Sequence, residues 1–212
     1  MFLTYLFKKA VGRSKPPAFL FYDSYPLMLE RANRPFDDEM NIALIGYRCS
    51  GKTAVGKVLA RQLGRDFLDT DSVIEGHEGC PIETIVSTRG WEHFRSIEKS
   101  VIERISRQEN LVIATGGGAV IDKENVTNLK QNAWIIWLKG SPGVLKSRME
   151  KEQRSGKIRP SLTGADPLVE ISQVLDTRNR LYAQAATFVI DTSALTVEEV
   201  AAAIISKLPK AM

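Results

Sequence analysis

The sequence predicts an α/β fold, in which a parallel sheet of five strands is covered by helices on both faces. Two observations support this fold class. Five short and almost wholly apolar runs occur between residues 41 and 190, and stretches with helical spacing of apolar residues separate them. Strands that are apolar on both faces are typical of parallel sheets buried between helices.

The expected elements follow from these patterns in chain order. We expect strands at Asn41–Ile45, Phe67–Asp69, Leu111–Ala114, Ala133–Leu138 and Phe188–Ile190. We expect helices at Lys52–Leu63, Thr84–Ser106 with a break near Arg89–Gly90, Pro142–Glu150, Pro167–Ala186 and Val197–Leu208. Residues 151–165 are polar and contain Gly and Pro, so we expect a loop there.

Composition excludes several classes of protein. The chain has 212 residues, 43% hydrophobic and 25% charged, which is ordinary for a globular protein and excludes wholesale disorder and collagen. The net charge of +4 suits an anionic ligand but is too small to indicate nucleic acid by itself. The two cysteines are too few for a disulfide scaffold, and no apolar run is long enough to cross a membrane.

Residues 1–39 differ from the remainder, and we treat residues 40–212 as a separate domain. Residues 1–22 contain four basic residues, no acidic residue and a scatter of aromatic side chains. Their first apolar stretch precedes Lys8 instead of following a basic start, so a secretory signal is not expected. Three interpretations stay open: an organelle transit peptide, an extension that packs on the domain or stays disordered, and translation that starts at Met40.

The strongest motif is Gly46-Tyr-Arg-Cys-Ser-Gly51-Lys52-Thr53, which matches G-x-x-x-x-G-K-[ST]. It follows an expected strand and opens an expected helix, which is the context that a phosphate-binding loop requires. Backbone N–H groups wrap the phosphates, the helix N-terminus favours their charge, and Lys52 reaches the β- and γ-phosphates. The Thr53 hydroxyl is a ligand for Mg²⁺. The motif predicts a nucleotide site, and the alternative is a Gly-rich turn without a ligand.

Two carboxylates, Asp69 and Asp71, follow the second expected strand. Residues two apart on a strand point to the same side, so we expect both to face the crevice at the carboxyl ends of the strands. One carboxylate suits the metal, and the other suits a proton leaving an attacking hydroxyl. The alternative is a cap for a helix that begins near Ser72.

Other candidate groups are ambiguous when each is taken alone. Arg95 lies beside an apolar helical stripe, and its alternative role is an ion pair with Glu92 or Glu98. The run Gly116–Gly118 offers backbone N–H groups to a small anion, or it merely ends a strand. Arg178 has no distinctive context of its own.

The expected loop at residues 151–165 is strongly basic. A basic loop fits a lid that closes over phosphates and excludes water, and the alternative is a solvated run of charge. Its four cations are Lys151, Arg154, Lys157 and Arg159.

Together these motifs resemble the shikimate kinase family over roughly residues 41–207. The resemblance rests on the order of the phosphate loop, Asp69-Thr-Asp71, Phe94-Arg95, Thr115-Gly-Gly-Gly118, Arg159-Pro160 and Arg178-Asn-x-Leu-Tyr182. The last four separate this family from gluconate and nucleotide kinases. The resemblance implies a P-loop kinase with a lid that transfers the γ-phosphoryl group of ATP to the 3-hydroxyl of shikimate, in chorismate and aromatic amino acid biosynthesis.

The resemblance also implies residue roles. The catalytic residues would be Lys52, Asp71 and Arg159. ATP would be bound by Gly46, Cys49, Ser50, Gly51, Lys52, Thr53, Ala54 and Arg159, with adenine near Thr192–Leu195. Shikimate would be bound by Asp71, Arg95, Gly117, Gly118 and Arg178. Mg²⁺, the expected cofactor, would be held by Thr53 and, through water, by Asp69.

Four positions depart from the family pattern: Cys49 replaces a glycine, Ala54 a threonine, Ser161 an apolar residue and Arg180 a proline. A side chain at Cys49 crowds the loop or needs a changed backbone angle, and its thiol lies near a helix start, where thiols are acidic. Arg180 affects the helix beside Arg178, so the shikimate site is less secure than the ATP site.

Two other functions compete with this interpretation: a small-molecule kinase for another carboxylate-bearing acceptor, and a non-catalytic or regulatory nucleotide-binding domain. The pair Arg95 and Arg178 predicts a carboxylate on the acceptor, and the retained Lys52 and Asp71 favour catalysis. No second basic face or aromatic platform indicates nucleic acid. We expect a cytoplasmic monomer that binds ATP and shikimate but no membrane, with organelle import through residues 1–39 as the alternative.

Overall fold

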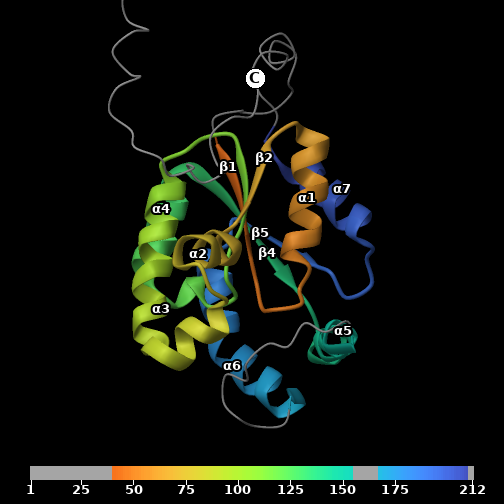
Figure 1. Ribbon diagram of the computed structural model, residues 1–212. Helices are drawn as coiled ribbons and strands as arrows, with labels where there is room; N and C mark the ends of the chain where they lie inside the picture. The colour runs from red at the N-terminus through yellow and green to blue at the C-terminus, as the bar shows by residue number, and fades with distance from the viewer. Residues whose placement is uncertain (1–39, 155–166, 210–212) are drawn as a thin grey trace, which may run out of the picture. The chain divides into compact units, whose positions relative to one another are not determined.

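The computed structural model describes residues 40–154 and 167–209 (Figure 1). The described chain forms a sheet with strand order β2-β3-β1-β4-β5, and every neighbouring pair of strands is parallel. The strands are β1 Asn41–Ile45, β2 Asp66–Asp69, β3 Leu111–Ala114, β4 Ala133–Lys139 and β5 Phe188–Asp191. The predicted fold class and the five predicted strands are confirmed.

Strand β1 lies at the centre of the sheet because its sequence suits burial on both faces. All five of its residues are fully buried. Its one polar residue, Asn41, donates to the Gln108 carbonyl oxygen at 2.6 Å and accepts from the Leu111 N–H at 2.8 Å. Because the strands are parallel, their carboxyl ends meet at one edge, and the predicted site residues follow β1, β2 and β3 there.

Helices cover both faces of the sheet (Figure 1). Leu59 and Ile204, from α1 and α7, pack with Ile42 on one face. Ile74 and Ile102, from α2 and α3, are buried in the cluster on the other face, which α4 also covers. The helices are α1 Lys52–Leu63, α2 Thr70–Glu78, α3 Ile82–Ser106, α4 Lys123–Asn132, α5 Pro142–Arg154, α6 Pro167–Ala185 and α7 Val197–Lys207, with a 3-10 turn η2 at Ala119–Ile121.

Helices α5 and α6 pack against each other at the end of the sheet that carries the site (Figure 1). Leu145 and Met149 of α5 form a small apolar cluster with Ile171 and Val174 of α6, and Tyr47 of the phosphate loop joins it. The two helices that flank residues 155–166 are therefore packed directly onto the phosphate loop.

The helices differ from the prediction in three places. Residues 151–154 continue α5 instead of forming a loop. Helix α2 begins at Thr70, immediately after β2, and not near Ser72. Helix α4 was not predicted, because Asn125 and Leu129 are its only buried residues. The predicted break in α3 is confirmed at Gly90, whose φ of 82° and ψ of 169° are not helical. Within residues 40–154 and 167–209, no helix is long and apolar enough to cross a membrane.

Candidate active site

The phosphate loop joins β1 to α1 and requires glycine at two positions. Gly46 has a φ of 142°, and a Cβ there would lie 2.5 Å from the Leu138 carbonyl oxygen. Gly51 has a φ of 97° at the N-cap of α1. Both angles favour glycine over any other residue. No side chain caps α1, so its first N–H groups remain available to an anion.

Cys49 has a backbone conformation that is strained for cysteine and unstrained for glycine. Its φ is 61°, in the left-handed region, so the predicted change of backbone angle is present. The side chain is buried, and its Sγ donates to a Glu152 carboxylate oxygen of α5 at 3.5 Å. The thiol therefore faces α5 and does not fill the loop.

Lys52 is held inside the phosphate loop by the loop's own carbonyl groups. Its Nζ donates to the carbonyl oxygens of Gly46 and Tyr47, both at 2.8 Å. Ser50 is buried beside it, and the Ala54 side chain is exposed. The ammonium charge is thus fixed at the concave side of the loop, where it can meet phosphate oxygens.

Thr53 and Asp69 form a pair of oxygen ligands that fits Mg²⁺. The Thr53 hydroxyl donates to Asp69 Oδ2 at 2.7 Å, which joins the phosphate loop to the end of β2. Among the described residues, no group of three or more His, Cys, Asp or Glu side chains is placed so that it could hold a metal ion. Mg²⁺ suits such a sparse site, because it usually keeps several waters and takes phosphate oxygens of the substrate as ligands.

The two aspartates are arranged by a helix start, and the prediction from strand alternation is wrong. Strand β2 ends at Asp69, and Asp71 lies in the first turn of α2. Asp69 Oδ1 accepts from the N–H groups of Asp71 at 3.1 Å and Ser72 at 3.5 Å, so the capping role applies to Asp69. Asp71 still reaches the glycine run: a Cβ on Gly116 would lie 2.7 Å from Asp71 Oδ1.

Glu98 is a site residue that the sequence reasoning considered only as an ion-pair partner. It is fully buried, and its Oε2 accepts from Arg95 at 2.5 Å. Its Oε1 has no hydrogen-bond partner in the described chain and faces Asp71 across Gly116, at 2.7 Å from a Cβ placed there. Burial raises the pKa of Glu98, and Arg95 opposes the shift. The signal in the sequence was its position four residues after Phe94, on the apolar stripe.

The two predicted substrate arginines meet at the glycine run from different helices. The Arg95 guanidinium of α3 lies 5.4 Å from the Trp91 ring centre, and a Cβ on Gly118 would overlap it. Arg178 of α6 donates to the Gly117 carbonyl oxygen at 3.3 Å. The structure therefore brings these five predicted residues to one place: Asp71, Arg95, Gly117, Gly118 and Arg178.

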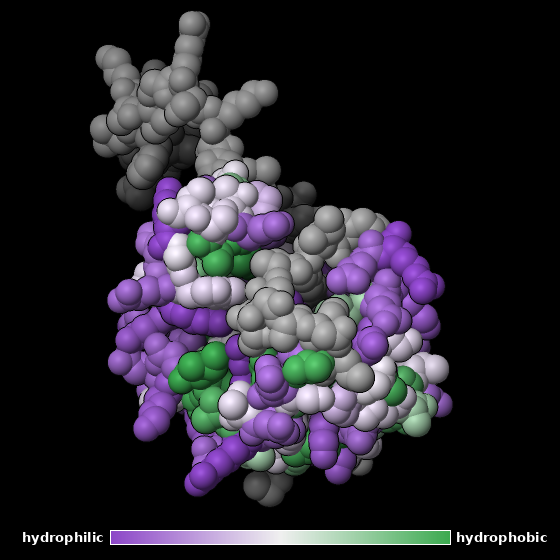
Figure 2. Space-filling model, turned by 90° about the horizontal axis from the view of Figure 1, so that it is seen from below, coloured by the Kyte–Doolittle hydropathy of each residue, from purple (hydrophilic) through white to green (hydrophobic). Residues whose placement is uncertain are grey.

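A cavity of about 390 Å³ adjoins the phosphate loop on the side of α5 and α7. Thr192 and Leu195, from the region matched to adenine, line it together with the loop. Arg148, which the sequence reasoning did not single out, also lines it and donates to the Thr192 carbonyl oxygen at 2.6 Å. The visible surface at this end of the molecule is mostly hydrophilic, with separate hydrophobic spots (Figure 2).

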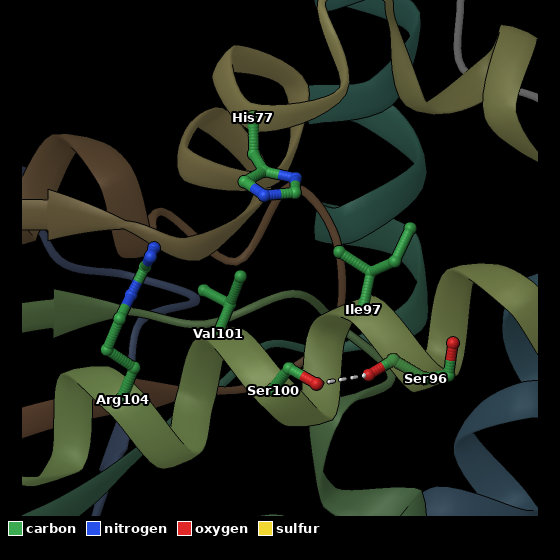
Figure 3. Close-up of a pocket in the computed structure, with 6 residues that line it drawn as sticks. All are labelled: His77, Ser96, Ile97, Ser100, Val101 and Arg104. Atoms are coloured by element: carbon green, nitrogen blue, oxygen red, sulfur yellow. Dashed lines mark hydrogen bonds between the residues drawn. The ribbon is translucent and has the colours of Figure 1, made fainter.

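A second cavity, of about 370 Å³, lies between α2 and α3. Figure 3 shows His77 of α2 above Ile97 and Val101 of α3, with Arg104 to one side. None of the predicted site residues lines it, so the phosphate loop and the glycine run define the candidate active site.

Part of the predicted lid lies outside the described residues. Arg159, predicted to contact ATP, belongs to that part, as do Lys157 and Ser161. The other two predicted lid cations, Lys151 and Arg154, are on α5.

Comparison with known proteins agrees with this geometry. The chain is 41% identical over 169 residues to the shikimate kinase of Symbiobacterium thermophilum, and the aligned region covers 80% of this chain and 96% of that protein. It is 42% identical over 167 residues to the shikimate kinase of Thermodesulfovibrio yellowstonii, spanning 79% of this chain and 94% of that protein.

Solved structures give the same result. The shikimate kinase from Acinetobacter baumannii in complex with shikimate has a TM-score of 0.74 at 33% identity, covering 79% of this chain and 92% of that one. A gluconokinase from Sinorhizobium meliloti has a TM-score of 0.52 at 20% identity and shares the fold alone. The sequence model of the family described as shikimate kinase matches residues 48–209. The chain belongs to the shikimate kinase family.

Proposed function

We propose that the protein transfers the γ-phosphoryl group of ATP to the 3-hydroxyl of shikimate, releasing ADP and shikimate 3-phosphate. The observation that carries this proposal is the contact between the two halves of the site. A Cβ placed on Gly117 would lie 3.3 Å from the backbone nitrogen of Arg48 in the phosphate loop. The phosphate loop, which we assign to ATP, is therefore in contact with the glycine run, which we assign to shikimate. Direct transfer between two bound substrates requires such closeness.

On the donor side, the uncapped start of α1 and the Lys52 ammonium group bind the phosphates of ATP. The backbone of Gly46, Cys49, Ser50, Gly51 and Ala54 contributes N–H groups. Thr53 and Asp69 would hold Mg²⁺, which when bound draws negative charge from the β- and γ-phosphates. We assign the ribose and adenine to the cavity lined by Arg148 and Thr192.

On the acceptor side, Arg95 and Arg178 bind the shikimate carboxylate, because two guanidinium groups suit a planar anion. Asp71 binds the hydroxyl groups and accepts the proton of the 3-hydroxyl. The bond from that oxygen to the γ-phosphorus forms while the bond from phosphorus to the ADP oxygen breaks, and the ADP oxygen leaves with the electron pair of the broken bond. Arg159, outside the described residues, is proposed to add positive charge at the phosphates.

We also propose that the enzyme is a cytoplasmic monomer. Both cysteines of the described chain are free, which fits a reducing compartment. Sedimentation velocity at micromolar concentration tests the monomer, since a dimer would sediment clearly faster.

The test is a coupled assay of ADP release at defined Mg²⁺ concentration, with and without shikimate. Shikimate-dependent release is expected, and its absence from folded protein would refute the proposal. Lys52→Ala should abolish turnover, whereas Lys57→Ala, which removes an exposed lysine of the same helix, should not. Asp71→Asn should lose turnover but keep ATP binding, while the exposed Asp66→Asn should keep both.

A further inference from the structure

The carbonyl group of Gly117 receives two hydrogen bonds from α6. The Tyr182 hydroxyl donates to this oxygen at 2.6 Å, and Arg178 donates to it at 3.3 Å. Arg178 is already assigned to the acceptor, but nothing in the proposed reaction uses Tyr182. The shorter of the two bonds therefore comes from a residue without an assigned role.

The Tyr182 side chain is a fixed and permanently protonated donor. It is 1% exposed, and its ring stacks on Trp137 of β4 with 5.6 Å between ring centres and 27° between planes. Burial raises the pKa of Tyr182 to about 12, so the hydroxyl keeps its proton at any working pH. The position of the hydroxyl is set by β4 and α6, which are both parts of the folded frame.

The bond from Tyr182 orients a peptide group that faces the acceptor. The described chain has no cis peptide bonds, so the Gly118 N–H points opposite to the Gly117 carbonyl to which it is joined. The Gly118 N–H has no hydrogen-bond partner among the described residues, and neither has the Gly117 N–H of the preceding peptide group. Gly118 packs on the Arg95 guanidinium, and Gly117 packs on the phosphate loop at Arg48. These unpaired N–H groups therefore lie among the residues assigned to both substrates.

The glycine run has one restraint of its own, the hydrogen bond that the Ala119 N–H donates to the Gly116 carbonyl oxygen at 3.1 Å, and this bond does not involve the Gly117 carbonyl group. Glycine populates both signs of φ with little preference, so a peptide group between two glycines can rotate at little cost. An external donor on the Gly117 carbonyl removes this freedom before the substrate binds. Preorganised N–H groups bind an anion or a hydroxyl better than groups that must first be ordered.

We propose that Tyr182 is a positioning residue, whose hydroxyl locks the Gly117–Gly118 peptide group so that the Gly118 N–H group is presented to the shikimate carboxylate and hydroxyls. This inference rests on the proposed function and assigns its acceptor site one further residue. It predicts that loss of the hydroxyl weakens the acceptor and leaves ATP unaffected.

Tyr182→Phe removes only the hydroxyl and keeps the buried ring. The KM for shikimate should rise about five- to tenfold, the usual effect of losing one hydrogen bond, while the KM for ATP changes by less than about twofold. Trp137→Phe is the matched control, since it disturbs the other ring of the stacked pair and leaves the hydroxyl in place. It should lower the melting temperature and leave the KM for shikimate unchanged.

Hydrogen exchange gives a second readout that does not depend on turnover. In ¹⁵N-labelled protein without shikimate, the Gly118 amide should exchange faster in Tyr182→Phe than in the wild type or in Trp137→Phe. An unchanged KM for shikimate in Tyr182→Phe, or an equal rise in Trp137→Phe, would overturn the positioning role. Wild-type protein without shikimate-dependent turnover would instead overturn the proposed function, so the two failures are distinguishable.

Discussion

Replacing Arg95 should damage the stability of the fold as well as the binding of shikimate. Its partner Glu98 is fully buried, and Arg95→Ala leaves that carboxylate without the guanidinium that donates to it. Removing one partner of a buried ion pair costs about 3–5 kcal/mol. The Arg95 side chain is 26% exposed, so solvent screens part of the interaction and we expect about 2–3 kcal/mol. For a domain of this size the melting temperature should fall by about 5–10 °C.

A second substitution separates stability from binding. In Arg95→Ala/Glu98→Gln the buried group is neutral and has nearly the same volume, so most of the lost stability should return. The KM for shikimate should remain high, because the guanidinium is still absent. Arg104→Ala, which removes a mostly exposed arginine of the same helix, is the control and should change neither quantity.

The pH dependence of unfolding provides an independent check on Glu98. Burial raises its pKa above 4.5, so near and above that pH the folded state holds a proton that the unfolded state has lost. Stability from this group therefore falls as pH increases from about 4.5 through the raised pKa. Glu98→Gln removes that fall, so its unfolding free energy relative to wild type should increase with pH across this window.

Urea unfolding at a series of pH values, followed by tryptophan fluorescence, measures the unfolding free energies. Thermal unfolding gives the melting temperatures, and the coupled assay gives the KM for shikimate. The reasoning would be refuted if Arg95→Ala melted within about 1 °C of the wild type. It would also be refuted if Glu98→Gln gave no recovery in the double variant, because the buried charge would then not be the cause.

Three further predictions concern the loops of the site. Cys49→Gly relieves a left-handed backbone angle and should stabilise the protein by about 0.5 kcal/mol; a lower melting temperature would contradict this. Thr53→Val removes the hydroxyl that contacts Asp69 and should lower kcat and raise the Mg²⁺ concentration for half-maximal rate, each about tenfold, which a Mg²⁺ titration measures. Gly118→Ala places a Cβ on the Arg95 guanidinium and should raise the KM for shikimate more than that for ATP, and equal effects on both would count against the assignment.

The sheet and the phosphate loop could be predicted from the sequence because their signals are local. Strand β1 contains four consecutive apolar residues followed by Gly46, and the glycines of the loop stand where the backbone angle requires them. Helix α4 could not be predicted in the same way. It buries only Asn125 and Leu129, so its apolar stripe is too weak to detect.

The residues around the glycine run could be predicted only in part, because contacts between distant parts of the chain place them. Strand alternation predicts that Asp71 faces the crevice at the carboxyl ends of the strands. Asp71 does lie at that end, beside Gly116, but the first turn of α2 places it there and strand alternation does not. Glu98 and Tyr182 gain their significance only from contacts across the fold: Glu98 faces Gly116 from α3, and Tyr182 reaches Gly117 from 65 residues away. The spacing after Phe94 places Glu98 on the apolar stripe of its helix, but it does not indicate which residues Glu98 contacts, and no spacing indicates the contact of Tyr182 with Gly117.

The most direct test of the central claim is the position of the transferred phosphoryl group. The protein is incubated with ATP, Mg²⁺ and shikimate, and the product is analysed by ¹H–³¹P correlation spectroscopy. The proposed transfer to the 3-hydroxyl, which follows from membership of the shikimate kinase family, predicts a phosphomonoester whose phosphorus couples to the proton on carbon 3 of shikimate. A product phosphorylated at another hydroxyl, or the absence of any phosphomonoester of shikimate, would contradict the account.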